Sequence, residues 1–141
     1  MAVVASHLID TSAAARVSYQ LVADRVLPLI SAGLAATCAP LDFEALWSAR
    51  SPVEYEQVRS DRTLAYEYLS TDDGDWQRAF EVQRELARLS ELRAVGMPDL
   101  LIAAVAERHR VTVLHYDGDF ETIARITGQP TEWAAFPGSA G

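Results

Sequence analysis

The stretch AVVASHLIDTS, residues 2–12, sets the expected fold class, because its character changes abruptly at Asp10. Residues 2–9 are apolar and partly β-branched, which predicts a short buried strand. Asp10, Thr11 and Ser12 are residue types that favour helix N-caps, so a helix is expected to follow. The sequence therefore predicts a strand with a carboxylate at its carboxyl end and a helix directly after it.

Strands and helices alternate along the rest of the chain. A helix is predicted over 21–30, closed by Gly33, and a second strand over 37–39. The later expected elements are helices from Pro40 to Ala49, over 53–69, after the turn 71–75, over 98–109 and over 120–127, a strand over 111–115, and an edge strand over 130–133.

The helix after the turn 71–75 is expected to be capped by Asp75. Its spacing predicts a buried stripe made of Trp76, Ala79, Phe80, Gln83, Leu86, Ala87 and Ser90.

This order of elements is typical of an α/β protein. We expect a three-layer α/β/α sandwich with a short central parallel sheet, formed by a single domain over residues 1–135. The segment 136–141 is rich in Pro, Gly and Ser and is expected to be a disordered tail.

The amino-acid composition indicates how the core is stabilised and in which cellular compartment the protein is expected. Half of the 141 residues are hydrophobic, which suffices for a core without structural metal or disulfides. Cys38 is the single cysteine, so a disulfide framework is excluded and a cytoplasmic, reducing compartment is expected. No run approaches the roughly 18 apolar residues of a membrane span, so no membrane association is expected.

All 12 basic residues are arginines, and lysine is absent. This absence excludes P-loop phosphate binding, lysine Schiff bases and the phosphorelay sites that use a lysine. The net charge of -8 argues against a protein that coats nucleic acid. It leaves open a nuclease that brings its positive charge as metal ions.

Carboxylates follow three of the predicted strands. Asp10 comes directly after the first strand, Glu44 lies within two turns of the second, and Asp117 lies two residues past a third. Because ligands of parallel sheets bind at the carboxyl ends of the strands, these groups are expected at one edge. Singly, each has a plainer explanation: Asp10 as a cap, Asp117 as a turn residue, Asp99 after Pro98 as a helix-dipole partner, and Asp119 as a helix cap.

A cluster of these carboxylates requires compensation. Two carboxylates about 5 Å apart repel by roughly 3 kcal/mol at an effective dielectric near 20. Either the cluster takes up protons or it binds a divalent cation, and oxygen ligands favour Mg²⁺ or Mn²⁺. His7, His109 and His115 lack the spacing of a zinc site and are interpreted as structural or surface residues.

Four blocks of this sequence resemble PIN-domain ribonucleases, and in particular the VapC toxins of type II toxin–antitoxin pairs. The blocks are LIDTSA at 8–13, FEAL at 43–46, PDLLIAA at 98–104 and LHYDGDFE at 114–121. The resemblance implies that Asp10 and Asp99 are the principal metal ligands and that Glu44 and Asp117 complete the catalytic carboxylates. It also implies that Asp117 is a metal ligand and that Asp119 is an accessory ligand or a cap. Leu100 departs from the family pattern, and Asp42 competes with Glu44 for its role.

The resemblance implies hydrolysis of RNA by a water that Mg²⁺ activates, with Mn²⁺ as a possible substitute. Ser12 is implied to orient Asp10, and Ser12 and Arg16 are the expected substrate-binding residues.

The same likeness implies a VapB-like antitoxin as partner, itself dimeric and DNA-binding, whose tail covers the carboxylates. A homodimer is also expected. Val53, Tyr55, Val58, Tyr66 and Tyr68 are expected to bind the antitoxin or a second copy, with core packing as the rival explanation. The alternative functions are a catalytically silent PIN-like binding module and a PIN nuclease of RNA processing outside any toxin–antitoxin pair.

Overall fold

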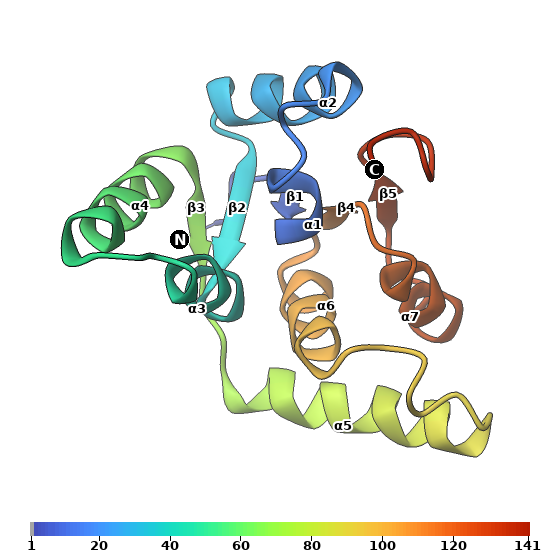
Figure 1. Ribbon diagram of the computed structural model, residues 1–141. Helices are drawn as coiled ribbons and strands as arrows, with labels where there is room; N and C mark the ends of the chain where they lie inside the picture. The colour runs from blue at the N-terminus through green and yellow to red at the C-terminus, as the bar shows by residue number, and fades with distance from the viewer. Residues whose placement is uncertain (1) are drawn as a thin grey trace.

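The computed structural model describes residues 2–141 and contains a five-stranded parallel sheet (Figure 1). The strands lie in the order β3-β2-β1-β4-β5. Their bounds are His7–Ile9 for β1, Ala35–Cys38 for β2, Glu67–Leu69 for β3, Thr112–His115 for β4 and Thr131–Trp133 for β5. Every neighbouring pair is parallel, as predicted for an α/β protein.

Helices cover both faces of this sheet (Figure 1). Their bounds are Thr11–Ala14 for α1, Gln20–Ser31 for α2, Ala39–Trp47 for α3, Pro52–Ala65 for α4, Asp73–Arg88 for α5, Met97–His109 for α6 and Asp119–Thr127 for α7. Figure 1 shows α2 above the sheet and α5 and α6 below it. The three-layer α/β/α sandwich is confirmed.

Adjacent strand residues point to opposite faces and so belong to two separate cores. Leu8 packs in the core with α5, α6 and α7, whereas its neighbour Ile9 packs in the core with α2. Val113 and Leu114 divide in the same way. Cys38 is fully buried in the first core, and burial raises the pKa of its thiol to about 12.

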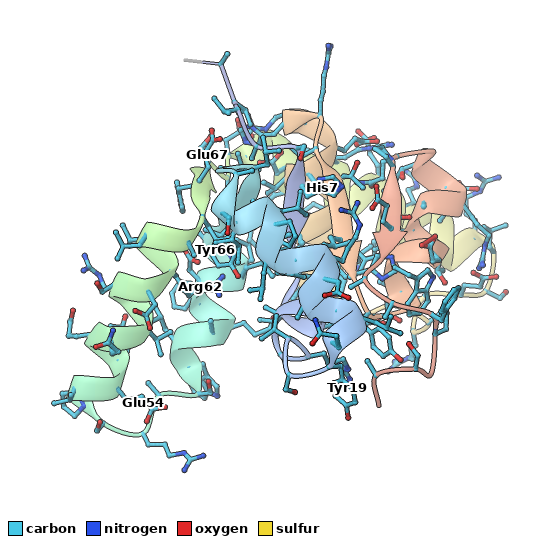
Figure 2. The ribbon with its side chains drawn as sticks, turned by 90° about the horizontal axis from the view of Figure 1, so that it is seen from above. His7, Tyr19, Glu54, Arg62, Tyr66 and Glu67 are labelled. Atoms are coloured by element: carbon cyan, nitrogen blue, oxygen red, sulfur yellow. The ribbon has the colours of Figure 1, made fainter. Side chains whose placement is uncertain are left out.

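Helix α4 has no buried residue and is joined to the domain by a polar cluster. Arg62 Nε donates to Asp42 Oδ1 at 2.9 Å, and its terminal nitrogen donates to the Thr37 hydroxyl at 2.9 Å. The Arg62 guanidinium also lies over the Tyr66 ring, 5.0 Å from its centroid. Figure 2 shows Arg62 on α4 and Tyr66 directly after the helix ends. Asp42 is therefore a structural ion-pair partner, which leaves Glu44 as the candidate for the site.

The predicted helix over 53–69 was wrong at its end. The helix stops at Ala65 because Tyr66 is extended, and residues 67–69 form β3 against β2. The predicted first strand was also too long, since only residues 7–9 of the range 2–9 pair in the sheet.

The predicted face of α5 was only partly right, since Ala79 and Leu86 are buried as expected but other members of the stripe are not. Asp72 caps this helix, and Asp75 is its third residue, in a reciprocal capping box. Trp76 and Phe80 are exposed, whereas Asp75 is buried because its carboxylate accepts two hydrogen bonds from Arg108 of α6, at 2.8 and 3.0 Å.

The segment 136–141 is not a free tail in the structure, contrary to the expectation of disorder. Ala140 is 1% exposed and packs in the core with α2. Its backbone N–H donates to the Tyr116 hydroxyl at 2.8 Å. Small, polar composition suggested disorder, but a buried partner at Tyr116 fixes the segment.

Among the helices of residues 2–141, none combines the length and the apolar character needed to cross a bilayer.

Candidate functional site

The predicted carboxylates come from segments that start at the carboxyl edge of the sheet. Asp10 follows β1 directly, Asp117 lies two residues after β4, and Glu44 lies on α3, which follows β2 without a loop. Asp99 lies in the first turn of α6. Since β1 is the central strand between β2 and β4, these segments begin side by side.

Asp99, Asp117 and Asp119 form the tightest group. One carboxylate oxygen of each lies within 4.8 Å of the others. Asp119 is the first residue of α7, whose N-cap is Gly118, and its Oδ2 accepts a hydrogen bond from the Gly96 N–H at 3.0 Å. The carboxylate that accepts the Asp119 N–H, at 3.0 Å, is that of Asp117. Asp119 is therefore directed at the cluster and is not the cap of its own helix.

Asp10 is 4% exposed and fixed by Ser12. Its Oδ2 accepts hydrogen bonds from the Ser12 hydroxyl at 2.5 Å and from the Ser12 N–H at 3.0 Å. Burial raises the pKa of Asp10, with repulsion from Glu44 and Asp117 adding to it, although the Ser12 hydrogen bonds oppose the shift. These two hydrogen bonds hold the Asp10 carboxylate against Ser12.

Glu44 reaches the site from α3. Its Oε1 accepts a hydrogen bond from the Thr11 hydroxyl at 2.6 Å, which joins α3 to α1. Glu44 itself is exposed, so it lies at the solvent side of the buried Asp10.

The cluster has an excess of negative charge. Burial, a hydrogen bond with Asp119 and the charges of Asp10 and Asp117 raise the pKa of Asp99 to about 8. Within residues 2–141, none of the ion pairs involves Asp10, Glu44, Asp99, Asp117 or Asp119. Oxygen donors without a basic partner fit a hard divalent cation, which would replace the proton that Asp99 retains.

His115, interpreted from the sequence as a structural or surface residue, is a structural residue that supports the site. It is fully buried, and its Nδ1 accepts the backbone N–H of Asp117 at 3.1 Å. A neutral ring then carries its proton on Nε2, which donates to Glu121 Oε1 at 3.0 Å. Burial lowers the pKa of His115 despite the nearby Glu121, so the neutral ring holds the Asp117 backbone in place.

Arg16, predicted to bind substrate, has other contacts in the structure. Its guanidinium donates to the Ser12 carbonyl at 2.7 Å and to the Ala140 carbonyl at 3.2 Å. It also lies over the Tyr116 ring, 4.8 Å from the centroid. These contacts place Arg16 behind Ser12.

Comparison with known proteins identifies the family of the chain. The family model of the PIN domain matches residues 7–126. The chain belongs to the PIN-domain family. This PIN domain is 46% identical to Ribonuclease VapC21 of Mycobacterium tuberculosis over 134 residues, covering 95% of the chain and 97% of that protein. It is 40% identical to Ribonuclease VapC51 of the same species over 127 residues, covering 90% and 91%. Its relatives thus place the PIN domain among the VapC proteins.

Solved structures of low sequence identity share the fold. The PIN domain superposes on a chain of DNA-bound VapBC from Salmonella typhimurium with a TM-score of 0.73, at 19% identity, covering 93% of this chain and 99% of that one. For VapBC2 from Rickettsia felis, bound to a fragment of promoter DNA, the TM-score is 0.72 at 14% identity, covering 90% and 97%.

Proposed function

We propose that this PIN domain is a metal-dependent endoribonuclease and the toxin of a VapBC toxin–antitoxin pair. The observation that carries the proposal is the group formed by Asp99, Asp117 and Asp119, with Asp10 close enough to raise the pKa of Asp99 and Glu44 close enough to raise that of Asp10. None of these five carboxylates has a basic partner among the ion pairs of the described chain. The names of the VapC relatives, each called a ribonuclease, support the choice of RNA as substrate.

Asp10, Asp99, Asp117 and Asp119 are the residues proposed to bind the cation, which is Mg²⁺ or, as a substitute, Mn²⁺. When bound, the cation supplies a water of lowered pKa and offsets the charge that grows on the phosphate. Ser12 keeps the buried Asp10 in one orientation, and His115 fixes the backbone of Asp117. Glu44, exposed near the buried Asp10, is the residue proposed to take up the proton that the attacking water releases.

Removal of the metal should abolish cleavage. We expect the purified chain to cut RNA in Mg²⁺ or Mn²⁺, to lose at least about 100-fold of its rate in EDTA, and to recover when excess Mg²⁺ is added. Titration with Mn²⁺ by calorimetry measures binding without reference to activity. Equal cleavage in EDTA would contradict metal dependence, and a folded chain that binds no Mn²⁺ would be a silent binding module.

A continuous apolar surface next to the site supports a protein partner. A groove of about 490 Å³ lies between α3 and α4 and is lined by Ala39, Asp42, Phe43, Leu46, Trp47, Tyr55 and Tyr68. A second, of about 610 Å³, shares Phe43 and extends to Trp76, Met97 and Pro98. No arginine lines either groove, so RNA phosphates have little to bind there. We propose that the antitoxin covers this surface.

Replacing Trp47 tests that surface, because its side chain is 89% exposed and contributes little to folding. Trp47→Ser should weaken binding of the co-expressed antitoxin by at least about 10-fold, measured by calorimetry, without lowering the melting temperature. Leu27→Ser on α2, which covers the opposite face of the sheet, is the control. The antitoxin to use is the product of a short reading frame directly upstream, and absence of such a frame would favour a PIN nuclease of RNA processing.

A homodimer is the other assembly proposed for this chain. If size-exclusion chromatography shows that Trp47→Ser converts a dimer into a monomer while antitoxin binding persists, the surface belongs to the second copy.

A further inference from the structure

Helix α1 carries the residue that orients Asp10 but is too short to be stable alone. It spans four residues, Thr11–Ala14, whereas isolated helices below about 12 residues are marginal in water. The Ser12 hydroxyl uses its single proton on Asp10 Oδ2 and accepts the Tyr116 N–H at 2.8 Å. Its direction is thus fixed only as long as α1 keeps its place beside Tyr116.

Arg16 supplies one part of that restraint. The Arg16 N–H donates to the Ala13 carbonyl, and the carbonyl of Ser12 is instead capped by the Arg16 side chain at 2.7 Å. The same guanidinium lies over the Tyr116 ring. Arg16 therefore connects the end of α1 to the residue whose backbone contacts the Ser12 hydroxyl.

The segment 136–141 supplies the other part. The Ala140 carbonyl accepts a hydrogen bond from Arg16 Nε at 3.2 Å, and the Ala140 N–H donates to the Tyr116 hydroxyl at 2.8 Å. Tyr116 is 8% exposed and packs edge-on against Trp133, so it is a rigid base for these contacts. Residues at the two ends of the chain thus meet behind one carboxylate.

We propose that Arg16 and the segment 136–141 are positioning groups for Asp10, acting through Ser12 from outside the carboxylate cluster. The proposal rests on the proposed function, because Asp10 must be a metal ligand for its orientation to matter. It differs from substrate binding by Arg16, since two of the guanidinium nitrogens are already occupied by backbone carbonyls. Disturbing this restraint should change metal affinity and kcat, with no change in the KM for RNA.

The test combines Arg16→Ala, Arg16→Lys and Tyr116→Phe in the full chain. We expect Arg16→Ala to weaken Mn²⁺ binding by about 10-fold in calorimetry and to lower kcat in proportion, while KM is unchanged. Arg16→Lys should recover part of both, because an ammonium group can still donate to one carbonyl. Tyr116→Phe keeps the ring under Arg16 but removes the acceptor of the Ala140 N–H, so it should weaken Mn²⁺ binding in the same direction.

The double variant Arg16→Ala with Tyr116→Phe shows whether the two residues act on Asp10 through one shared set of contacts or independently of each other. A loss no greater than that of the more damaging single variant supports the proposal, whereas additive losses would overturn it. Arg84→Ala on the exposed side of α5 controls for removal of one positive charge. A raised KM in Arg16→Ala with unchanged Mn²⁺ affinity would overturn the proposal in favour of substrate binding.

Titration of the wild-type chain with Mn²⁺ distinguishes failure of the positioning role of Arg16 from failure of the proposed function. A wild-type chain that binds no Mn²⁺ overturns the proposed function and this inference together. Mn²⁺ binding by the wild type that is unaltered in Arg16→Ala overturns this inference alone.

Discussion

Asp99→Asn should lower the rate of RNA cleavage in Mg²⁺ by about 100- to 1000-fold. The substitution keeps the shape of the side chain and removes one ligand charge from the group that also contains Asp117 and Asp119. The rate should be measured under single-turnover conditions with saturating Mg²⁺, so that the effect on chemistry is separated from weaker binding. Glu91→Gln, a carboxylate change on the loop after α5, is the matched control. A retained rate would remove Asp99 from the catalytic group.

The same variant should melt at a higher temperature than the wild type when no metal is present. The pKa of Asp99 is about 8 in the folded chain and near 3.8 when unfolded, so the folded state binds more protons between these values. Metal-free stability therefore falls as pH rises from about 4 to 8, and Asp99→Asn removes that loss. We expect a gain of about 1–2 kcal/mol at pH 8, or about 3–8 °C, and little gain at pH 4.

The stability of the variant must be compared with that of the wild type, because the contribution of His115 to stability changes with pH in the opposite direction to that of Asp99. Burial lowers the pKa of His115, so its contribution to stability is lost as pH falls below its unfolded value. That contribution is common to both chains and cancels in their difference. A variant that melts below the wild type at pH 8 without metal would contradict the repulsion assigned to the cluster.

Asp75→Asn should destabilise the domain by about 2–3 kcal/mol. Asp75 is 1% exposed, and its carboxylate accepts two hydrogen bonds from Arg108 and one from the Asp72 N–H. Removing the charge leaves Arg108 without its buried partner, although Arg108 is partly exposed and regains some solvation. Urea unfolding would measure the change, and Asp73→Asn, exposed in the same turn, should alter stability by less than about 0.5 kcal/mol.

The pH dependence of this pair has a definite sign. Burial alone would raise the pKa of Asp75, but the hydrogen bonds from Arg108 and Asp72 outweigh burial and lower it. The stabilisation is therefore present at neutral pH and is lost only as pH falls through the folded pKa, below about 4. A difference between wild type and Asp75→Asn that stays constant down to pH 2 would count against the ion pair as its source.

The carboxylate cluster could be predicted because it follows from topology. Strand ends in a parallel sheet share one edge, so Asp10, Glu44 and Asp117 could be assigned to it from strand order alone. The sequence could not decide whether Asp119 is a helix cap or a metal ligand. That choice depends on the backbone N–H of Gly96, in the loop before α6, which donates to the Asp119 carboxylate.

The errors arose where a distant partner decides local structure. Strand β3 is three residues long and is stabilised by β2, so the helical pattern before it appeared to continue. Asp75 turned inward because of Arg108, 33 positions later, so Asp75 shares the buried face of α5 with Ala79 and Leu86, while Trp76 and Phe80 stay exposed. The segment 136–141 has the composition of a tail, and Tyr116, not its own residues, gives it order.

Cys38 gives these experiments a built-in reporter. It is the chain's single thiol, it lies inside β2 with no exposed surface, and its high pKa keeps it protonated at neutral pH. An alkylating reagent should therefore modify it only in molecules whose sheet has opened. The alkylation rate, followed by mass spectrometry, should be slower in metal-free Asp99→Asn and faster in Asp75→Asn than in the wild type, without any added label.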